Sequence, residues 1–433
     1  MPDIHVDFKE YGKPLKNTVT GMYLPKSPDW NAIRRLFRLD PSIVYLNSGT
    51  EGSIPKEIQK NYFRYIKEWA SSPSYYFAFD KTFQDWQKSN REKAGKFIGT
   101  TGENICITNN TSEGLSMALL GVNLREGDEI LSTLHDYPSS ESACHVLSKT
   151  RGVIYTQLYL PSPAESKEEI VNIFRNAINP KTKVLLISHI TYTTGLRMPA
   201  KELCRLAAEK NIITIIDGAH ALGTLPLEME ETGCDFYAAA GHKWLNGPPG
   251  TGILFIRDAK RNPYNLLPII SELYGFETPY PVSDMLQIRG CSDTPGFTAM
   301  TDAMALNELI GKEKILNRLL ELNHYLQMRI ISEWGKDCLL SPSCTPGTQE
   351  LCSGIVSFVP SRNPLKRFDK DFITGISQRV IQEYKIWIRD VSFMDKPSDG
   401  NKLTYVLRVS VNLFNNFDDI DKLILAIKAL CEK

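Results

Sequence analysis

The sequence lacks the features that would place it among nucleic-acid-binding or membrane proteins. Its 50 basic and 50 acidic side chains cancel, so no net field favours nucleic acid or an anionic membrane. No apolar run approaches the roughly 18–20 residues that span a bilayer. The polar start at Met1–Tyr11 lacks the basic-then-apolar pattern of a secretory signal. We therefore expect no nucleic-acid partner, no membrane partner and a cytoplasmic location.

Regular cysteine spacing and nucleotide-binding loops are missing as well. The nine cysteines are odd in number and scattered, and no C-x-x-C pair occurs. This predicts reduced, mostly buried thiols rather than a disulfide framework or a zinc site, and no bound metal. The glycine-rich fingerprints of dinucleotide-binding folds and of P-loops are also absent after the first strand, which argues against a nucleotide-binding enzyme.

What is present is an alternation of short strands and helices. Six β-branched runs are separated by amphipathic stretches such as Lys201–Lys210, namely Ile105–Ile107, Ile130–Leu131, Val153–Tyr155, Val184–Ile187, Ile212–Ile216 and Gly252–Ile256. Strands that are buried on both faces and separated by helices form parallel sheets. The alternation therefore predicts a large three-layer α/β/α domain with a mostly parallel sheet.

The two ends of the chain do not show this alternation of strands and helices. Residues 1–42 look like an irregular arm with a short helix near Trp30–Phe37, followed by a strand at Ile43–Leu46. A long helical pattern over Ala299–Trp334 leads into strands and a closing helix, expected at Ile355–Phe358, Ile386–Ile388, Tyr405–Val411 and Asp418–Glu432. We predict an arm over 1–42, a large domain over 43–310 and a smaller C-terminal α/β domain over 311–433.

Ligands in α/β sheets bind at the carboxyl ends of the parallel strands, and several such loops here carry reactive groups. Thr111 and Ser112 follow the strand Ile105–Ile107 and precede an apolar helix. Two hydroxyls beside the backbone N–H groups of a helix N-terminus can hold a phosphate. The same residues can equally be an ordinary helix cap, and this motif alone does not decide.

Three further loops carry an acid, a base and an aromatic ring. Asp217 ends the apolar strand Ile212–Ile216, where a carboxylate needs a cationic partner unless it caps the next helix. Lys243 follows the apolar run Phe236–Ala240, and burial there would lower its pKa and leave the free amine that a Schiff base requires. Tyr137, held by a following proline, can present a flat face to a planar ring or be a half-buried loop residue.

In this order, the motifs resemble the class V aminotransferase family. The resemblance covers about residues 43–430 and is carried by Asp217–His220, Asp235–Tyr237 and Gly241–Trp244. Within the family, Tyr45–Gly52, Asp136–Ser139 and His242–Leu245 are most similar to the isopenicillin N epimerase-like branch. Thr111–Gly114 is also similar to the cysteine desulfurase and selenocysteine lyase branch. The resemblance implies pyridoxal 5′-phosphate (PLP) as cofactor and the aspartate-aminotransferase-like fold type I.

Positions that match the family's motifs receive roles by this resemblance. Lys243 is expected to form the Schiff base and to move the proton at Cα. Asp217 is expected to pair with the pyridinium nitrogen, where a carboxylate keeps the ring an electron sink. His220 matches the contact to the phenolic oxygen, and Tyr137 matches the ring-stacking position.

The remaining roles concern the phosphate and the substrate. Thr111, Ser112 and His242 lie at phosphate-contacting positions. Arg408 matches the arginine that binds the substrate carboxylate, which suits a planar guanidinium. Arg389 matches a second arginine that some branches have near that site.

The sequence departs from the family pattern in several places. Thr191 and Tyr192 stand where relatives often have Asn. Ala240 replaces a phosphate-contacting hydroxyl. Ser292, after Cys291, stands near a Thr that relatives lend to the partner's phosphate across a homodimer interface. The resemblance therefore predicts a homodimer with a shared site, and it leaves open whether Ser292 substitutes for that Thr.

Reaction type is only partly constrained. No cysteine lies between Arg389 and Arg408, and a desulfurase needs a thiol there to accept sulfur, so a persulfide mechanism is disfavoured. The resemblance favours an enzyme that binds an α-amino acid as an external aldimine and acts as an epimerase or C–S lyase. A class V aminotransferase, a cysteine desulfurase or selenocysteine lyase, and a non-catalytic PLP-binding sensor remain the alternatives.

Overall fold

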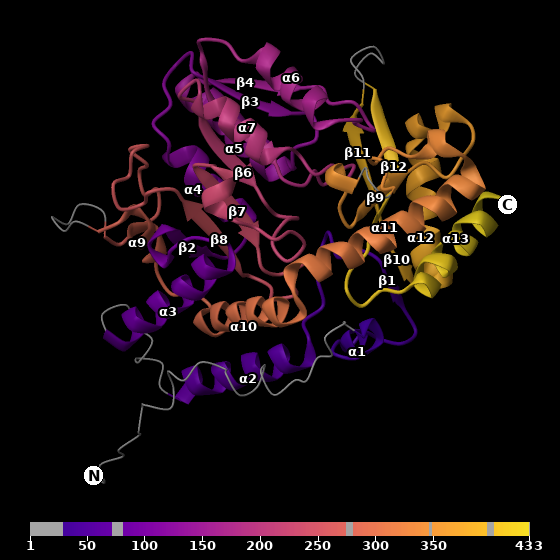
Figure 1. Ribbon diagram of the computed structural model, residues 1–433, viewed down its shortest axis with the longest axis horizontal. Coiled ribbons are helices and arrows are strands. Elements are labelled where there is room, and N and C mark those ends of the chain that lie inside the picture. Colours follow the sequence, from indigo (N-terminus) through magenta and orange to yellow (C-terminus); the bar gives the residue numbers. More distant parts are fainter. Residues whose placement is uncertain (1–28, 72–80, 274–279, 346–348, 396–401, 433) are drawn as a thin grey trace, which may run out of the picture.

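The computed structural model describes residues 29–71, 81–273, 280–345, 349–395 and 402–432. A seven-stranded sheet forms the centre of its larger part (Figure 1). All of its neighbouring strands are parallel except β8, which runs antiparallel to both neighbours. In spatial order the strands are β2 (Ile105–Thr108), β8 (Gly252–Ile256), β7 (Phe236–Ala240), β6 (Ile213–Asp217), β5 (Thr182–Ser188), β3 (Glu129–Thr133) and β4 (Ile154–Leu158).

Both faces of this sheet are buried, as the β-branched runs predicted. In β5, Leu185 and Ile187 pack into one apolar core, and Val184 and Leu186 pack into another. Because side chains alternate along a strand, the two cores lie on opposite faces of the sheet. The predicted three-layer α/β/α architecture is therefore confirmed. The helices of this part are α2 (Lys56–Ser71), α3 (Lys81–Phe97), α4 (Thr111–Gly121), α5 (Pro138–Arg151), α6 (Lys167–Ala177), α7 (Ala200–Ala208), α8 (Met229–Thr232), α9 (Val282–Gln287) and α10 (Thr294–Ile310).

A smaller α/β unit follows in the chain. Its antiparallel sheet has the order β11 (Arg389–Met394), β12 (Leu403–Ser410) and β9 (Ile355–Phe358). Three helices accompany it, α11 (Lys312–Trp334), α12 (Lys370–Tyr384) and α13 (Phe417–Cys431). The predicted continuous helix over Ala299–Trp334 is wrong in one respect, because it breaks at Gly311, whose φ of +101° no helix accommodates.

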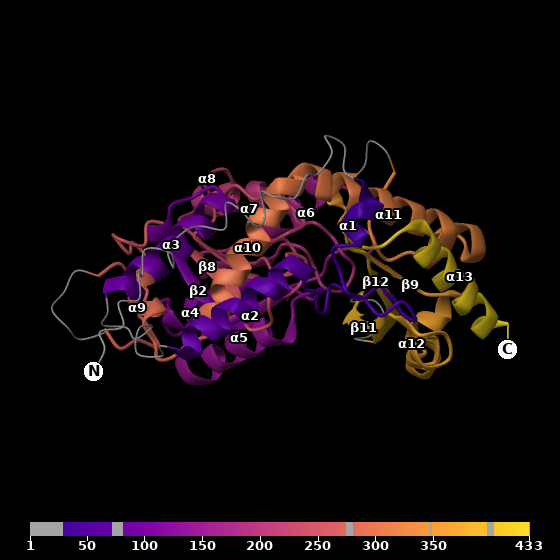
Figure 2. The same cartoon turned by 90° about the horizontal axis from the view of Figure 1, so that it is seen from below.

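The start of the described chain joins the smaller unit. Strand β1 (Val44–Tyr45) pairs in parallel with β10 (Ile386–Trp387) and does not enter the large sheet. Helix α1 (Trp30–Arg34) lies near α11 and α13 in Figure 2, and Arg34 forms an ion pair of 2.6 Å with Asp419 of α13. Residues around 43, placed in the large domain by the predicted boundaries, thus pair with the C-terminal unit. We propose the division between the two units at Gly311.

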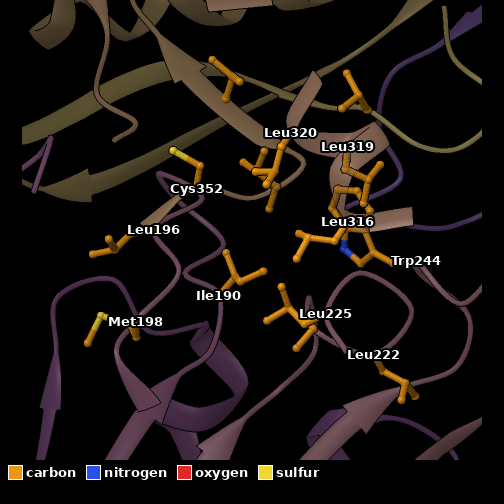
Figure 3. Close-up of a cluster of buried hydrophobic side chains, with 14 of the residues drawn as sticks. Ile190, Leu196, Met198, Leu222, Leu225, Trp244, Leu316, Leu319, Leu320 and Cys352 are labelled. Carbon is orange, nitrogen blue, oxygen red and sulfur yellow. The ribbon is translucent and has the colours of Figure 1, made fainter. Parts of the chain in front are cut away.

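One continuous apolar core contains side chains from both units. Ile190 and Trp244, from loops that follow large-sheet strands, lie near Leu316 of α11, and Leu222 and Leu319 belong to the same cluster (Figure 3). All five side chains are buried. The loops are therefore held against a rigid helix, which fixes the polar side chains that they carry.

Two of the sequence expectations fall outside the described residues. These are the course of the arm over residues 1–28 and the aromatic run over residues 75–79. In the part of the chain that the structure describes, none of the helices combines the length and apolar character that crossing a bilayer requires.

Candidate functional site

The carboxyl ends of neighbouring strands bring the predicted residues together. Asp217 is the last residue of β6, and Lys243 follows the end of β7. Tyr137 immediately precedes α5 after β3, and Thr111 begins α4 after β2. Since β7, β6, β5 and β3 are adjacent in the sheet, their loops share one edge. Residues that lie more than 100 positions apart in the sequence thus form one cluster.

Asp217 is a buried carboxylate held by neutral donors. It is 6% exposed, and it accepts hydrogen bonds from the N–H of Ala219 at 3.0 Å and from Ser140 Oγ at 3.4 Å. Burial raises its pKa, an effect that these hydrogen bonds and the nearby Lys243 oppose. A buried carboxylate of this kind is stabilised by a cation, and a protonated pyridine nitrogen is such a cation.

Lys243 has the properties of an amine that reacts with a carbonyl. Burial lowers its pKa to about 8, with Arg408 and Arg389 adding to the effect and Asp217 opposing it. Its Nζ lies 5.8 Å from the centroid of the Tyr137 ring. Near neutral pH the side chain therefore has a substantial population of the neutral amine, which is the nucleophilic form.

His220 is fixed in one tautomer by a neighbour. The indole N–H of Trp244 donates to His220 Nδ1 over 3.1 Å, and both side chains are buried. Because the indole nitrogen only donates, Nδ1 must accept and the ring proton lies on Nε2. Burial and the nearby cations, Lys243 first, hold the pKa of His220 well below its usual value. The residue is thus a neutral imidazole with Nε2–H available as a donor, as a contact to a phenolic oxygen requires.

Two buried polar atoms at the other end of the cluster lack partners within the described residues. They are Thr111 Oγ1, at the start of α4, and His242 Nδ1. The helix cap is supplied by Asn110, whose side chain accepts from the N–H of Glu113 at 2.9 Å, so Thr111 is not needed as a cap. Ser112 Oγ donates to Ser139 Oγ over 2.9 Å. Unpaired polar atoms beside the N–H groups of a helix N-terminus fit the phosphate of PLP.

The loop that contains Gly52 packs tightly against the loop that carries Lys243. The N–H of Gly52 donates to His242 O over 2.8 Å, and a Cβ at Gly52 would lie 1.8 Å from Lys243 O. No side chain larger than hydrogen fits there without displacing the lysine. The loop between β1 and α2 is thus in backbone contact with the loop that carries Lys243.

Arg408 enters the cluster from β12. It is 1% exposed, and it donates to Tyr192 O at 3.2 Å, Thr50 Oγ1 at 3.1 Å and Asn47 Oδ1 at 3.4 Å. Its Nε has no partner, and no carboxylate of the described residues forms an ion pair with it. Burial lowers its pKa to about 10. Such a guanidinium is suited to a carboxylate ligand.

The two residues of the loop after β5 have different environments. The Tyr192 ring meets the Tyr137 ring edge-on, with centroids 5.2 Å apart and an interplanar angle of 87°. Thr191 Oγ1 instead lies 3.1 Å from Thr194 Oγ1 and accepts from the N–H of Leu196 at 3.0 Å. Tyr192 therefore belongs to the cluster, whereas Thr191 holds the local turn.

The structure does not bring Ser292 to the other site residues. Its carbonyl accepts from the N–H of Thr294 at 2.8 Å, next to the start of α10. The loop is nevertheless tied to the α4 N-terminus, because Arg289 pairs with Glu113 at 3.0 Å. Sequence reasoning missed this ion pair, which joins residues 176 positions apart.

A second buried carboxyl was also missed. Asp136 accepts from Ser188 Oγ at 2.8 Å and from the N–H of Thr133 at 3.1 Å. Burial raises its pKa to about 7, and the nearby Asp217 adds to the effect. In the sequence, the motif Asp136–Ser139 attracted attention only for its tyrosine. The acid directly before that tyrosine could have indicated the second carboxyl group.

Comparison with known proteins now bears on the site. The model of the aminotransferase class-V family matches residues 44–423. The chain belongs to this family. It is accordingly a PLP-dependent enzyme of fold type I, as the motifs implied. In the described parts of the chain, no group of three or more His, Cys, Asp or Glu side chains could hold a metal ion.

Curated relatives of the chain include enzymes with different named activities. The chain is 26% identical to the isopenicillin N epimerase of Streptomyces clavuligerus over 416 residues, which cover 93% of this chain and 98% of the relative. It is 25% identical over 287 residues to the hercynylcysteine sulfoxide lyase of Schizosaccharomyces pombe, covering 65% of this chain and 72% of that one. A solved structure of a lysine-to-alanine mutant of C-DES, with glycine covalently linked to the PLP cofactor, has the same fold. It superposes with a TM-score of 0.76 at 20% identity, covering 91% of this chain and 98% of its own.

Proposed function

We propose that this enzyme binds an α-amino acid at the Lys243 cluster and catalyses either epimerisation at Cα or lysis of a β C–S bond. The main observation behind this proposal is that Lys243 and Asp217 are both buried at one edge of the sheet. The pKa of Lys243 is lowered there and that of Asp217 is raised. The similarity to an isopenicillin N epimerase and to a sulfoxide lyase supports these two reactions over transamination.

The chain's own residues fit the cofactor that the family uses. When bound, PLP supplies an electron sink that weakens the bonds at Cα of an amino acid. Asp217 would hold the proton on the pyridine nitrogen, and His220 would donate Nε2–H to the phenolic oxygen. Thr111, Ser112 and His242 would hold the phosphate.

Lys243 has two tasks in this proposal. Its neutral Nζ would hold the cofactor, and as a free amine it would serve as the general base that takes the proton from Cα. A pKa near 8 suits both tasks at neutral pH, because the amine then gains and loses a proton readily. The Tyr137 ring lies beside this amine.

Arg408 would bind and orient the substrate carboxylate. Its hydrogen bonds to Tyr192, Thr50 and Asn47 fix the guanidinium while its Nε stays unpaired. A fixed carboxylate holds Cα in one position relative to Lys243 Nζ, which selects the bond that breaks.

The cysteines argue against a persulfide-forming desulfurase. No cysteine lies between Arg389 and Arg408. Seven of the nine are buried, Cys431 is half-buried and Cys291 is exposed, and none forms a disulfide. The free thiols support our proposal of a cytoplasmic location. A desulfurase or an aminotransferase remains the alternative that product analysis can identify.

We also propose a homodimer whose partner completes the phosphate site. The loop that carries Ser292 is anchored to the α4 N-terminus through Arg289 and Glu113, yet its Cys291 is exposed. Two large apolar side chains of α2, Phe63 and Ile66, are exposed as well. Light scattering measures the mass. If the site is shared, PLP affinity falls as the protein is diluted through the dimer dissociation range, and a monomer with tight PLP binding at every concentration would refute the dimer.

A product screen tests the proposed reaction. The holoenzyme is mixed with L- and D-amino acids and S-substituted cysteines, and stereochemistry, keto acid, ammonia and sulfide are followed. Epimerisation or sulfur release with a keto acid supports the proposal. Lys243→Ala should abolish either product, while the exposed control Lys210→Ala should leave both unchanged. Stoichiometric amino-group transfer to an added keto acid would show an aminotransferase instead.

A further inference from the structure

The small sheet places two arginines side by side at the site. Arg389 of β11 and Arg408 of β12 are direct partners in the antiparallel register. Side chains of such a pair lie on the same face, with Cβ atoms roughly 4.5–5.5 Å apart, and like charges there are destabilising. The pKa of Arg408 is lowered first by burial and then by the charge of Arg389. An arrangement with this cost calls for an anionic ligand.

No carboxylate of the described residues forms an ion pair with either guanidinium. The Arg408 side chain donates only to neutral oxygens, and the Arg389 side chain makes no hydrogen bond or ion pair within the described ranges. Asp390, the acid next to Arg389, instead accepts from Thr374 Oγ1 at 2.9 Å. Neither guanidinium therefore has an anionic partner among the described residues.

Both arginines lie close enough to the reacting end of the site for their charges to act on its ionisable groups. Each lowers the pKa of Lys243 and of His220. The charges that act on His242, at the phosphate end, are those of Lys243 and Glu51. The phosphate therefore does not account for the two guanidinium groups.

The cluster then has more positive charge than one α-carboxylate balances. Asp217 is matched by the cofactor's ring nitrogen under the proposed function. Asp136 is held behind it by neutral donors, and its pKa of about 7 leaves it partly protonated. One α-carboxylate balances the positive charge of Arg408, and the positive charge of Arg389 remains unbalanced.

We propose that the substrate is an α-amino acid with a second anionic group on its side chain, bound by Arg389. This inference rests on the proposed function. Arg408, the more buried of the two, binds the α-carboxylate, and Arg389, which is only half-buried, binds the side-chain anion nearer to solvent. A planar guanidinium recognises a carboxylate, sulfonate or sulfinate through paired hydrogen bonds.

Matched pairs of amino acids test this with binding as the readout. The cofactor-loaded wild-type enzyme is titrated with aspartate against asparagine, glutamate against glutamine, and S-carboxymethylcysteine against S-methylcysteine. Dissociation constants come from the change in cofactor absorbance and from calorimetry. We expect the dianionic member of at least one pair to bind 10-fold or more tightly than its neutral counterpart.

The variants separate Arg389 from Arg408. Arg389→Gln should remove the preference within that pair and leave the affinity for the neutral member within about threefold. Arg389→Lys should retain part of the preference. Arg379→Gln, an exposed arginine of α12 paired with Glu383, is the matched loss of one charge and should change neither value.

Three outcomes would overturn the inference. Equal binding of charged and neutral members by the wild type removes it while leaving the proposed function intact. A uniform loss of affinity for all amino acids in Arg389→Gln shows that both arginines bind the same α-carboxylate. If no α-amino acid binds at all, the proposed function fails together with the inference.

Discussion

Replacing Arg408 by Leu should separate substrate binding from stability. The guanidinium is 1% exposed, so an ordinary buried arginine at this position would be expected to hold the fold together. Its pKa is lowered to about 10 from 12.5, mainly by burial, and such a shift corresponds to roughly 3 kcal/mol of unfavourable charge burial. Removing the charge relieves this cost.

The loss of hydrogen bonds works in the opposite direction. Three bonds to neutral acceptors disappear, which costs roughly 1 kcal/mol each. The two effects are of similar size, so we expect the free energy of unfolding of the ligand-free Arg408→Leu protein to change by less than about 1.5 kcal/mol. The lost pair with a substrate carboxylate costs on the order of 2–4 kcal/mol, which raises KM about 30- to 1,000-fold.

Arg318 provides a matched control for this prediction. It is 7% exposed, pairs with Glu321 at 2.7 Å and donates to Asn415 O at 3.1 Å. Arg318→Leu should lower the free energy of unfolding by about 1.5–3 kcal/mol and leave KM unchanged, because it leaves the buried carbonyl of Asn415 unpaired, whereas the half-exposed Glu321 stays hydrated. Denaturant titration and steady-state kinetics measure both quantities. If Arg408→Leu unfolds as readily as Arg318→Leu, or keeps a normal KM, the assignment of Arg408 to the substrate is refuted.

Further predictions concern the residues around the cofactor. Asp217→Asn should keep the fold and some PLP but lower kcat at least about 100-fold, since an amide does not hold the ring nitrogen protonated; near-normal kcat would show a misassigned pairing. Trp244→Phe removes the donor to His220 Nδ1 and should shift the cofactor absorbance maximum and its pH midpoint, measured by spectrophotometry, whereas unchanged spectra would show that the tautomer is fixed otherwise. Because the folded pKa of Lys243, about 8, lies below its unfolded value of 10.5, the unfolded chain binds more protons between them. The stability of cofactor-free protein should gain a rising contribution across pH 8–10.5 that Lys243→Met removes, and identical pH curves for the two proteins would contradict this.

Sequence alone predicted the fold where apolar runs are sharply bounded. The strand Gly252–Ile256 was predicted with its observed bounds, as was Ile355–Phe358, because each is mostly apolar and follows a glycine-containing loop. Strand β11 was missed, since Arg389 and Asp390 interrupt its β-branched pattern. The break at Gly311 was also missed, because the helical periodicity continues through it.

The site was predictable to the extent that it follows the strand ends. Asp217 ends a strand, and Lys243 and Tyr137 follow strand ends within a few residues, so the local sequence pattern placed all three at one edge of the sheet. The tautomer of His220 depends on Trp244, 24 residues away, and the isolation of Arg408 depends on which acids are absent around it. Such features arise from packing between distant segments, which no local pattern contains.

Cofactor attachment at Lys243 is the central claim, and one measurement tests it most directly. The PLP-loaded enzyme is reduced with borohydride, digested, and its peptides are analysed by mass spectrometry for a phosphopyridoxyl group. We expect the label on the peptide that contains Lys243 and its loss in Lys243→Ala. A label on another lysine, or an unlabelled wild-type protein, would contradict the assignment.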